Sequence, residues 1–432
     1  MTALSVAALL ALLLVAARLG GALFARLRQP RVVGEIAAGA LVSALGLTTG
    51  ALAGGEAAGP TRAVVCDLLA TAGFALLMFV SGAGMRRLLP AEDRKIVAWL
   101  ATSGTALPFA AAVALAAWVP LDTLLGPAGS HAALILVLGF AAAVTSIPVI
   151  SRIFHDLKVL DSRFARLVLG VAVVEDVVLW AVLPVATALA RAGDLPARRI
   201  AGHVALSLLF VVMCLALGPR LVRTLRSAAA PLVRRVPGLW LVTLLVAFLL
   251  AGKACDVPTF LAAFFAGLAL VPGAAAAEGT AEAAEVRALE RLERLTYASI
   301  VPVAFAIVGT KLELGAGFSP LLVLALIGVA CAVKLASVAL GAWRAGFRGL
   351  DVVNLAVATN ARGGPGIVLA AVAYEERIVN GAGYTALVLL AVVTSQLAGA
   401  WLEWLLRGGR PLLAGDLAPA PVAVDVAPAG GS

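Results

Sequence analysis

The chain has 432 residues, of which 62% are hydrophobic and 13% are charged, and its mean hydropathy is +1.05. A water-soluble domain of this length could not bury so much apolar surface, so the composition excludes that class and predicts an all-α, polytopic membrane protein. The net charge is +9, but the arginines gather in short segments between apolar runs, and no basic patch interleaved with aromatic residues suggests a nucleic-acid partner.

Apolar runs bounded by charged residues or by Gly and Pro predict about thirteen transmembrane helices. In the first run the positive charges follow the apolar stretch, which favours a retained span with its N-terminus outside. Lys and Arg then gather in alternate loops, so the C-terminus is expected in the cytoplasm and the protein in the inner (plasma) membrane, among its lipids. The expected spans cover residues 2–26, 32–49, 64–85, 95–119, 131–152, 164–190, 200–226, 238–254, 257–273, 296–310, 319–343, 351–374 and 383–406.

The spans divide into six, one and six, with residues 200–226 as the linker between the halves. The second set of six starts from the opposite side of the membrane, which predicts inverted repeats of the kind common in secondary transporters. Residues 1–407 are therefore expected to form one transmembrane domain. The segment 408–432 is rich in Pro, Ala and Gly, and its composition predicts a disordered cytoplasmic tail.

Two expected spans, 131–152 and 351–374, are interrupted at matching places, because each is the fifth span of its half. Unwound backbone is tolerated inside a membrane only where protein or water satisfies its polar groups, so paired breaks predict the substrate site. Two hydroxyl side chains in the first break would supply oxygen atoms near the crossing. The residues expected to break the helices or line the crossing are Thr145, Ser146, Pro148, Asn360, Gly363, Gly364 and Pro365.

The ionisable residues Glu175, Asp176, Lys334 and Arg362 lie deep within apolar runs. A carboxylate at this depth costs about 2.5 to 3.5 kcal/mol, so the acids should be paired or bind a transported cation, unless the span is misplaced and they lie at the interface. Adjacent helical residues point about 100° apart, so Lys334 is expected to pair with one acid and leave the other free. Arg362 either offsets the carbonyl ends of two half-helices or caps one helix end.

The sequence indicates no cofactor and no resident metal ion. The cysteines occur singly, without the C-x-x-C spacing of a metal site, and the histidines are dispersed near expected span ends. These residues are Cys66, Cys214, Cys255, Cys331, His131, His155 and His203.

Several motifs resemble those of the monovalent cation:proton antiporters, in the branch of the Kef-like and sodium/proton exchangers. Residues 29–39, QPRVVGEIAAG, resemble that family's P-x-V-x-G-E-I-x-A-G opening, and the T-S-x-P run at 145–148 is similar to its first crossover. The acidic pair at 175–176 stands where members carry Asp-Asp, Asn-Asp or Gln-Asp, and Lys334 stands where this branch has its lysine. Residues 264–268, FFAGL, resemble the family's F-x-A-G-L. The resemblance extends to about residue 407.

The resemblance implies that Asp176 is the ion-carrying carboxylate and that Glu175 pairs with Lys334. It further implies a mobile core domain with two crossed helices and a homodimer formed through the opening spans of each half. The chain departs from the family at residues 79–85, FVSGAGM, where many members place an acid after the glycine. Glu175 is also an unusual first member of the acidic pair.

The expected function is exchange of Na⁺ or K⁺ for protons by alternating access, with cation and proton competing for Asp176. The metal ion at Asp176 would thus be a transported one. Electrogenic and electroneutral exchange are both left open, because Lys334 could also release a proton. The alternatives are a sodium-coupled symporter of an organic anion bound by Arg362, a membrane-embedded enzyme that uses Glu175 and Asp176 as acid and base, and a sensor that transports nothing.

Overall fold

The computed structural model describes residues 2–26, 29, 31–46, 59–85, 93–116, 121–160, 162–191, 197–255, 257–270, 280–313 and 319–414. These described residues form helices, and their one β-type pairing is an isolated bridge between Leu125 and Val379. Eight helices are long and apolar enough to cross a membrane, or up to ten if each of two bent pairs forms one span. The all-α membrane class is confirmed, while the number of thirteen spans stays a prediction.

The described residues contain α-helices and two short helical turns of other types. A 3₁₀ turn occupies Leu121–Thr123, and a π-helical turn occupies Thr296–Ile300. The helices are α1 Thr2–Arg26, α2 Arg31–Ala44, α3 Gly59–Met85, α4 Arg94–Leu115, α5 His131–Ala143, α6 Ile147–Asp156, α7 Arg163–Arg191, α8 Ala197–Ala216, α9 Gly218–Ala228, α10 Ala230–Arg235, α11 Pro237–Ala254, α12 Thr259–Ala269, α13 Ala281–Leu295, α14 Val301–Thr310, α15 Pro320–Arg344, α16 Leu350–Ala358, α17 Gly363–Glu375 and α18 Gly381–Arg407.

Each apolar run expected to span the membrane contains a helix, but several runs are divided. The first broken span becomes α5 and α6, and the second becomes α16 and α17. The expected linker becomes α8 and α9, which are bent by 57° at their junction. The run at 296–310 is only the second part of a longer helical stretch from Ala281 to Thr310. A π turn interrupts this stretch just before Pro302, which has no N–H to continue the regular hydrogen-bond ladder.

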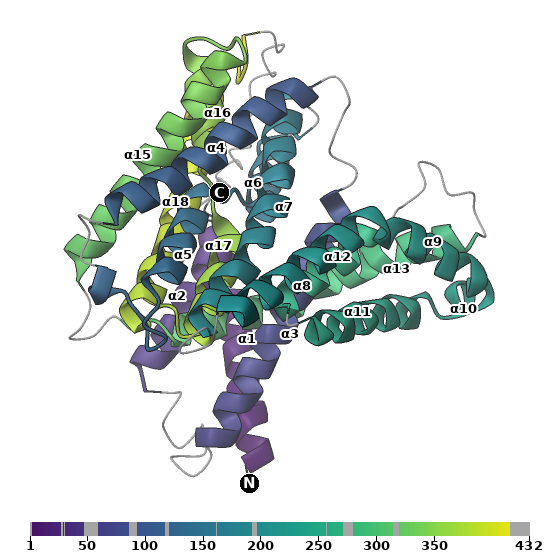
Figure 1. Cartoon of the computed structure of the whole chain (residues 1–432). Coiled ribbons are helices and arrows are strands. Elements are labelled where there is room, and N and C mark those ends of the chain that lie inside the picture. Colours follow the sequence, from purple (N-terminus) through teal and green to yellow (C-terminus); the bar gives the residue numbers. More distant parts are fainter. Residues whose placement is uncertain are drawn as a thin grey trace, which may run out of the picture.

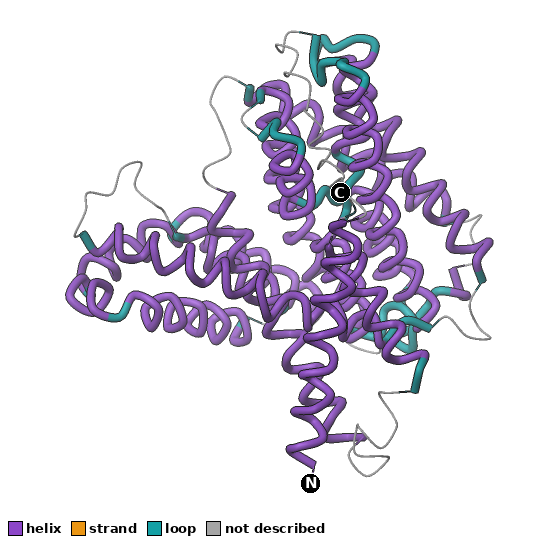
Figure 2. The backbone as a smooth tube through the Cα atoms, turned by 180° about the vertical axis from the view of Figure 1, so that it is seen from behind, coloured by secondary structure: helices purple, strands orange, loops and turns teal. Residues whose placement is uncertain are grey.

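The helices gather into two groups (Figure 1). One group holds α4 to α7 together with α15 to α18, and within it α4 packs on α5, α7 and α15 while α17 packs on α18. In the other group α12 packs on α3 and α11, and α14 packs on α1, α2 and α3. The view from behind shows the same division, with α8 to α13 extending to one side (Figure 2). Both helix breaks lie in the first group, and the breaks meet there.

Two close helix crossings in the second group are related by the expected repeat. Helices α2 and α14 cross at Gly39 and Gly309, and α3 and α12 cross at Gly82 and Gly267. A Cβ atom at any of these four glycines would overlap the backbone of the facing helix. In the repeat, α2 and α12 are equivalent second spans, and α3 and α14 are equivalent third spans. The same crossing therefore occurs once in each orientation, which is the arrangement expected of inverted repeats.

Replacing Gly309 with Ala is expected to destabilise the α2–α14 crossing. The added Cβ would overlap the carbonyl of Ile36, and such overpacking typically costs about 1–3 kcal/mol. Gly328→Ala is the matched control, because a Cβ at that helical position meets nothing within 4 Å. Thermal unfolding in detergent should show a lower melting temperature for Gly309→Ala and an unchanged or higher one for Gly328→Ala. Equal melting temperatures would show that the crossing tolerates a side chain.

The segment expected to be a tail begins with folded chain rather than disorder. Leu412 and Leu413 are each only 3% exposed. The Asn354 side chain donates to the Leu412 carbonyl at 3.0 Å, and the Ala414 amide donates to Asp351 Oδ1 at 3.0 Å. The Pro/Ala/Gly-rich composition concealed this apolar pair, which packs against the start of α16. The rest of the expected tail, residues 415–432, lies outside the described residues.

Candidate functional site

The two broken helices cross at their unwound segments. Helix α5 ends at Ala143 and α6 begins at Ile147, while α16 and α17, bent by 43°, are separated by residues 359–362. A backbone hydrogen bond joins the breaks, because the Ser146 amide donates to the Ala361 carbonyl at 2.6 Å. The half-helices therefore bring their free backbone ends to one place.

The second break depends on a glycine. Gly363 has a φ of +40°, and a Cβ there would lie 2.6 Å from Ser146 Oγ and overlap the side chain of Val149. The Gly363 amide donates to Ser395 Oγ of α18 at 3.0 Å, which satisfies a free donor at the start of α17. The next residues expected to break the helix, Gly364 and Pro365, lie in this first turn, where a proline is tolerated because its missing N–H would have no helical partner. Pro148 lies in α6, and its side chain is outside the described part.

Arg362 is 1% exposed and all five of its N–H donors have acceptors. Nε donates to the Ala141 carbonyl at 2.6 Å, and Nη2 donates to the carbonyls of Ala142 and Ala330 at 2.9 and 3.0 Å. Nη1 donates to the carbonyl and Oδ1 of Asn360 at 3.1 and 2.7 Å. Arg362 thus offsets the carbonyl end of α5 as well as that of its own break, which is the first of its two expected roles.

Lys334 of α15 also serves the carbonyl end of α5. Its ammonium donates to the carbonyls of Ala143 and of Gly104, the latter at 3.2 Å, and it forms an ion pair with Glu175 Oε1 at 2.6 Å. The side chains of Lys334 and Glu175 are both fully buried. A buried charge needs such partners, because an unpaired one would be strongly destabilising. The lysine therefore lies beside the acid that the resemblance assigned to it.

The Thr145 hydroxyl connects this ion pair to the second break. Its Oγ1 lies 2.6 Å from both Glu175 Oε2 and the Thr359 carbonyl. The single hydroxyl proton can be donated to only one of them at a time, and a charged acceptor forms the stronger hydrogen bond. The Ser146 hydroxyl has a different position, because it accepts from the Val149 amide at 3.4 Å at the start of α6.

Asp176 differs from its neighbour on α7. It is 2% exposed, and its Oδ1 atom is buried without a hydrogen-bond partner among the described residues. The charged groups that act on it are Glu175 and Lys334. A buried carboxylate oxygen without a donor is costly, and binding a cation or a proton removes that cost. Beside the crossing, Asp176 thus has a carboxylate oxygen without a donor in the described part of the chain, whereas both oxygens of Glu175 have one.

Gly104 of α4 is a site residue that the sequence did not reveal. Replacing it with Ala would place a Cβ 2.7 Å from Glu175 Oε1 and 3.3 Å from Lys334 Nζ. The ion pair would have to shift, so we expect any transport through this site to slow by about 10-fold or more, since 1.4 kcal/mol corresponds to a factor of ten. A flux assay in proteoliposomes measures this, with Gly328→Ala as the control. Undiminished flux in Gly104→Ala would mean that the close packing is unimportant.

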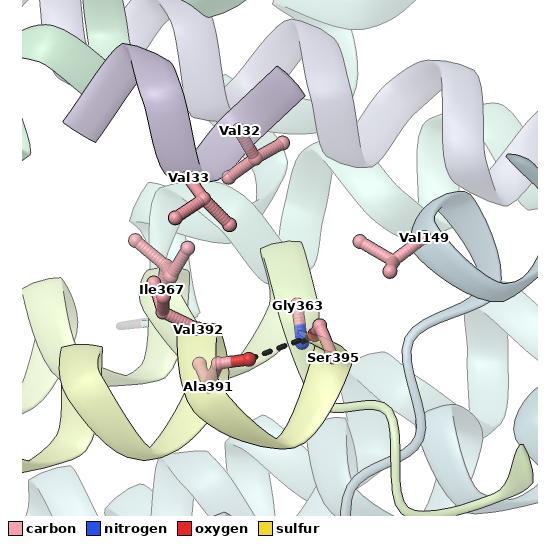
Figure 3. Close-up of a pocket in the computed structure, with 8 residues that line it drawn as sticks. All are labelled: Val32, Val33, Val149, Gly363, Ile367, Ala391, Val392 and Ser395. Atoms are coloured by element: carbon pink, nitrogen blue, oxygen red, sulfur yellow. Dashed lines mark hydrogen bonds between the residues drawn. The ribbon is translucent and has the colours of Figure 1, made fainter. Parts of the chain in front are cut away.

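A small, partly open pocket of about 10 Å³ lies next to the second break, where α2 meets α6, α17 and α18. Figure 3 shows Val32 and Val33 of α2 above Ile367, with Gly363 at the opposite side. The lining is apolar apart from Ser395 and backbone atoms, and neither acid of α7 belongs to it. This pocket therefore offers no carboxylate to a cation.

The described residues contain no group of three or more His, Cys, Asp or Glu side chains that could hold a metal ion. The structure brings together Glu175, Lys334, Thr145 and Arg362 around the crossing, with Asp176 adjacent. Sequence reasoning missed Ser395 and Gly104, because a serine and a glycine inside apolar helices carry no specific signal. It also missed that the backbone carbonyls of residues 141–143 accept hydrogen bonds from the Lys334 and Arg362 side chains.

Comparisons with known proteins agree with this architecture. The family model described as sodium/hydrogen exchanger, transmembrane, matches residues 10–408. The sodium proton antiporter MjNhaP1 of Methanocaldococcus jannaschii has a similar fold, with a TM-score of 0.58 and 14% identity, covering 93% of this chain and 97% of that one.

Similar sequences carry related names. Cation/H(+) antiporter 15 of Arabidopsis thaliana is 25% identical over 85% of this chain and 44% of its own length. The high-affinity Na(+)/H(+) antiporter NhaS3 of Synechocystis is 26% identical over 91% of this chain and 88% of its own length. The chain spans about half the length of the plant relatives it matches or less.

Proposed function

The chain belongs to the sodium/hydrogen exchanger family, and from that premise we propose that it is a secondary active antiporter that exchanges Na⁺ or K⁺ for protons. The observation that carries the proposal is the buried, unpartnered Oδ1 of Asp176 beside a fully paired Glu175. The names of the relatives, cation/H(+) and Na(+)/H(+) antiporters, give the reaction class.

In the proposed cycle, Asp176 binds a cation when it faces one side of the membrane and a proton when it faces the other. The two ligands compete for one carboxylate, so neither crosses without the return of the other. Unwound backbone, Thr145 and Ser146 lie at the crossing and are the further oxygen donors available to a cation that has shed its water. The positive charges of Lys334 and Arg362 offset the partial negative charge of the carbonyl end of α5, and Lys334 also neutralises Glu175.

The alternative of a symporter that binds an organic anion through Arg362 receives no support. All five N–H donors of that guanidinium already have protein acceptors, and the side chain is 1% exposed. An anion that bound Arg362 would have to break its hydrogen bonds to these buried carbonyls, which would then lack a donor. The family is one of transporters, and we propose no enzymatic reaction.

The proposed assembly is a homodimer in the plasma membrane, with the N-terminus outside and the C-terminus in the cytoplasm. Val15, Leu19 and Leu23 form one apolar stripe on α1 and are 54%, 67% and 56% exposed. Such a stripe needs lipid or a second copy of the chain to cover it. If the stripe is the dimer contact, Leu19→Arg should yield monomers in detergent, whereas unchanged dimers would exclude α1 from the contact.

The test is cation-induced collapse of a pH gradient in proteoliposomes that contain the purified chain. Na⁺, K⁺ and Li⁺ are added separately to vesicles that have a fluorescent pH indicator inside. Rapid collapse with at least one cation, and none in protein-free vesicles, is the expected result, and the active ions identify the substrates. If no cation collapses the gradient, the antiporter proposal is wrong, and uptake of organic solutes with Na⁺ becomes the next measurement.

A further inference from the structure

Two side-chain hydrogen bonds join the two helix groups where α14 ends and α18 begins. The Tyr384 hydroxyl of α18 donates to the Val308 carbonyl of α14 at 3.2 Å. The Thr385 hydroxyl, one residue further along α18, accepts from the Glu313 amide at 3.0 Å. Tyr384 and Thr385 are 1% and 0% exposed, so their side chains are shielded from water. The end of the α14 segment, in the second group, is therefore held by the first turn of α18, in the first group.

The Glu313 side chain adds a third contact at this boundary. Its carboxylate lies directly against Gly381, the first residue of α18, because a Cβ atom on that glycine would overlap it. The N-terminus of a helix carries a partial positive charge, which stabilises a carboxylate placed there. Only a residue without a side chain permits such a close approach, so Glu313 and Gly381 fit one another across the boundary between the groups.

Lys311 brings a positive charge to the same boundary. Its ammonium forms an ion pair with Asp67 Oδ1 of α3 at 2.7 Å, within the second group. The same charge acts on Glu375, the last residue of α17 in the first group. A carboxylate at the C-terminus of a helix meets the negative end of the helix dipole, so a nearby cation is needed to offset the repulsion. Lys311 supplies that cation from the facing group.

The groups meet differently beside the second break. There Val32 and Val33 of α2 share a pocket with Ile367 of α17, and its lining is apolar apart from Ser395 and backbone atoms (Figure 3). Apolar contact is non-directional, so such surfaces can shift past one another without breaking a specific bond. Hydrogen bonds depend steeply on distance and angle. The contacts between α14 and α18 are thus the ones that a relative movement of the groups has to break.

We propose that Glu313, Tyr384 and Thr385 form a latch that closes this end of the boundary between the helix groups, and that the latch opens once in each transport cycle. The proposal rests on the antiport proposed above, in which Asp176 faces each side of the membrane in turn. In the proposed orientation α14 runs from the cytoplasm to the outer side, so the latch closes the outer side. One hydrogen bond changes an equilibrium by about 2- to 10-fold, and the latch therefore favours the closed state.

The experiment locks the latch with a reversible cross-link. Glu313→Cys and Gly381→Cys are combined in a chain whose four native cysteines are replaced by serine, so that the two sulfur atoms occupy the space of the lost carboxylate. The control is Leu125→Cys with Val379→Cys, because these residues face each other in an isolated bridge within the first group. Cation-induced collapse of a pH gradient is measured in proteoliposomes before oxidation with copper phenanthroline, after it, and after reduction with dithiothreitol.

Oxidation should reduce exchange by the Glu313→Cys/Gly381→Cys protein at least 10-fold, reduction should restore it, and the control pair should exchange equally well in both states. Full exchange by protein that is shown to be cross-linked at the latch would overturn the proposal while leaving antiport intact. Absence of exchange in the wild type would instead count against antiport.

Tyr384→Phe tests the latch without any transport measurement. The variant loses the bond to Val308, and if the contacts open together, the Glu313 amide should exchange its hydrogen for deuterium about 2- to 10-fold faster, although Tyr384 does not bond that amide. Tyr374→Phe is the matched control, because its ring lies beside that of Tyr384 and its hydroxyl makes no hydrogen bond to the described residues. Equal exchange of the Glu313 amide in the two variants would overturn the proposal, even if the cysteine pair fails to fold.

Discussion

Replacing Asp176 with Asn should reduce cation/proton exchange by about 100-fold or more, because the amide has nearly the same shape but no charge for a cation and no acid proton to exchange. A loss of this size corresponds to about 3 kcal/mol, the lower end of what removing one partner of a buried ionic contact costs. The variant is measured by the collapse of a pH gradient in proteoliposomes, with the cation that the wild type uses.

Stability separates this effect from misfolding. Asp176 Oδ1 accepts no hydrogen bond from the described residues, so the substitution breaks none at that oxygen and relieves a buried charge. The melting temperature of Asp176→Asn should therefore equal or exceed that of the wild type. Asp122→Asn is the control: its side chain is 86% exposed beside His131, and activity should be unchanged. Persistent exchange in Asp176→Asn would exclude this carboxylate as the carrier.

The pairing of the buried ionisable residues could be predicted because a charge inside an apolar run carries a high free-energy cost. That cost alone indicated that Lys334 needs an acidic partner. In the structure its Nζ lies 2.6 Å from Glu175 Oε1. The paired breaks were predictable for a similar reason, since proline and glycine clusters at equivalent places in two halves seldom coincide by chance. Each signal consists of a few neighbouring residues, so it can be recognised without knowing how the helices pack.

The remaining partners could not be predicted, because they depend on contacts between distant parts of the chain. Gly104 and Lys334 are 230 positions apart, and the glycine has no side chain to suggest an ion pair beside it. The acceptors of Arg362 are mostly backbone carbonyls, which every residue possesses, so only the geometry of α5 selects them. The buried pair Leu412 and Leu413 was obscured by the composition around it.

Substituting Arg362 is expected to have the largest effect on folding of any change at the crossing. Its five donors serve five buried acceptors from α5, α15 and the second break. Lys in its place has three donors, so at least two acceptors would lose their partner at about 1–3 kcal/mol each. Since a folded protein is typically stable by only about 5–15 kcal/mol, Arg362→Lys should lower the melting temperature substantially, and Arg362→Met should prevent accumulation of folded protein.

Arg223→Lys is the matched control for the donor argument. Arg223 lies exposed on α9, so its replacement makes the same chemical change while removing no buried contact. Thermal unfolding in detergent should show little change for Arg223→Lys and a large decrease for Arg362→Lys. If the two variants melt alike, charge alone suffices at the second break, and the five-acceptor arrangement contributes little. A large difference would mean that planar, multidentate donation holds the two broken helices together, which lysine cannot supply even though it carries the same charge.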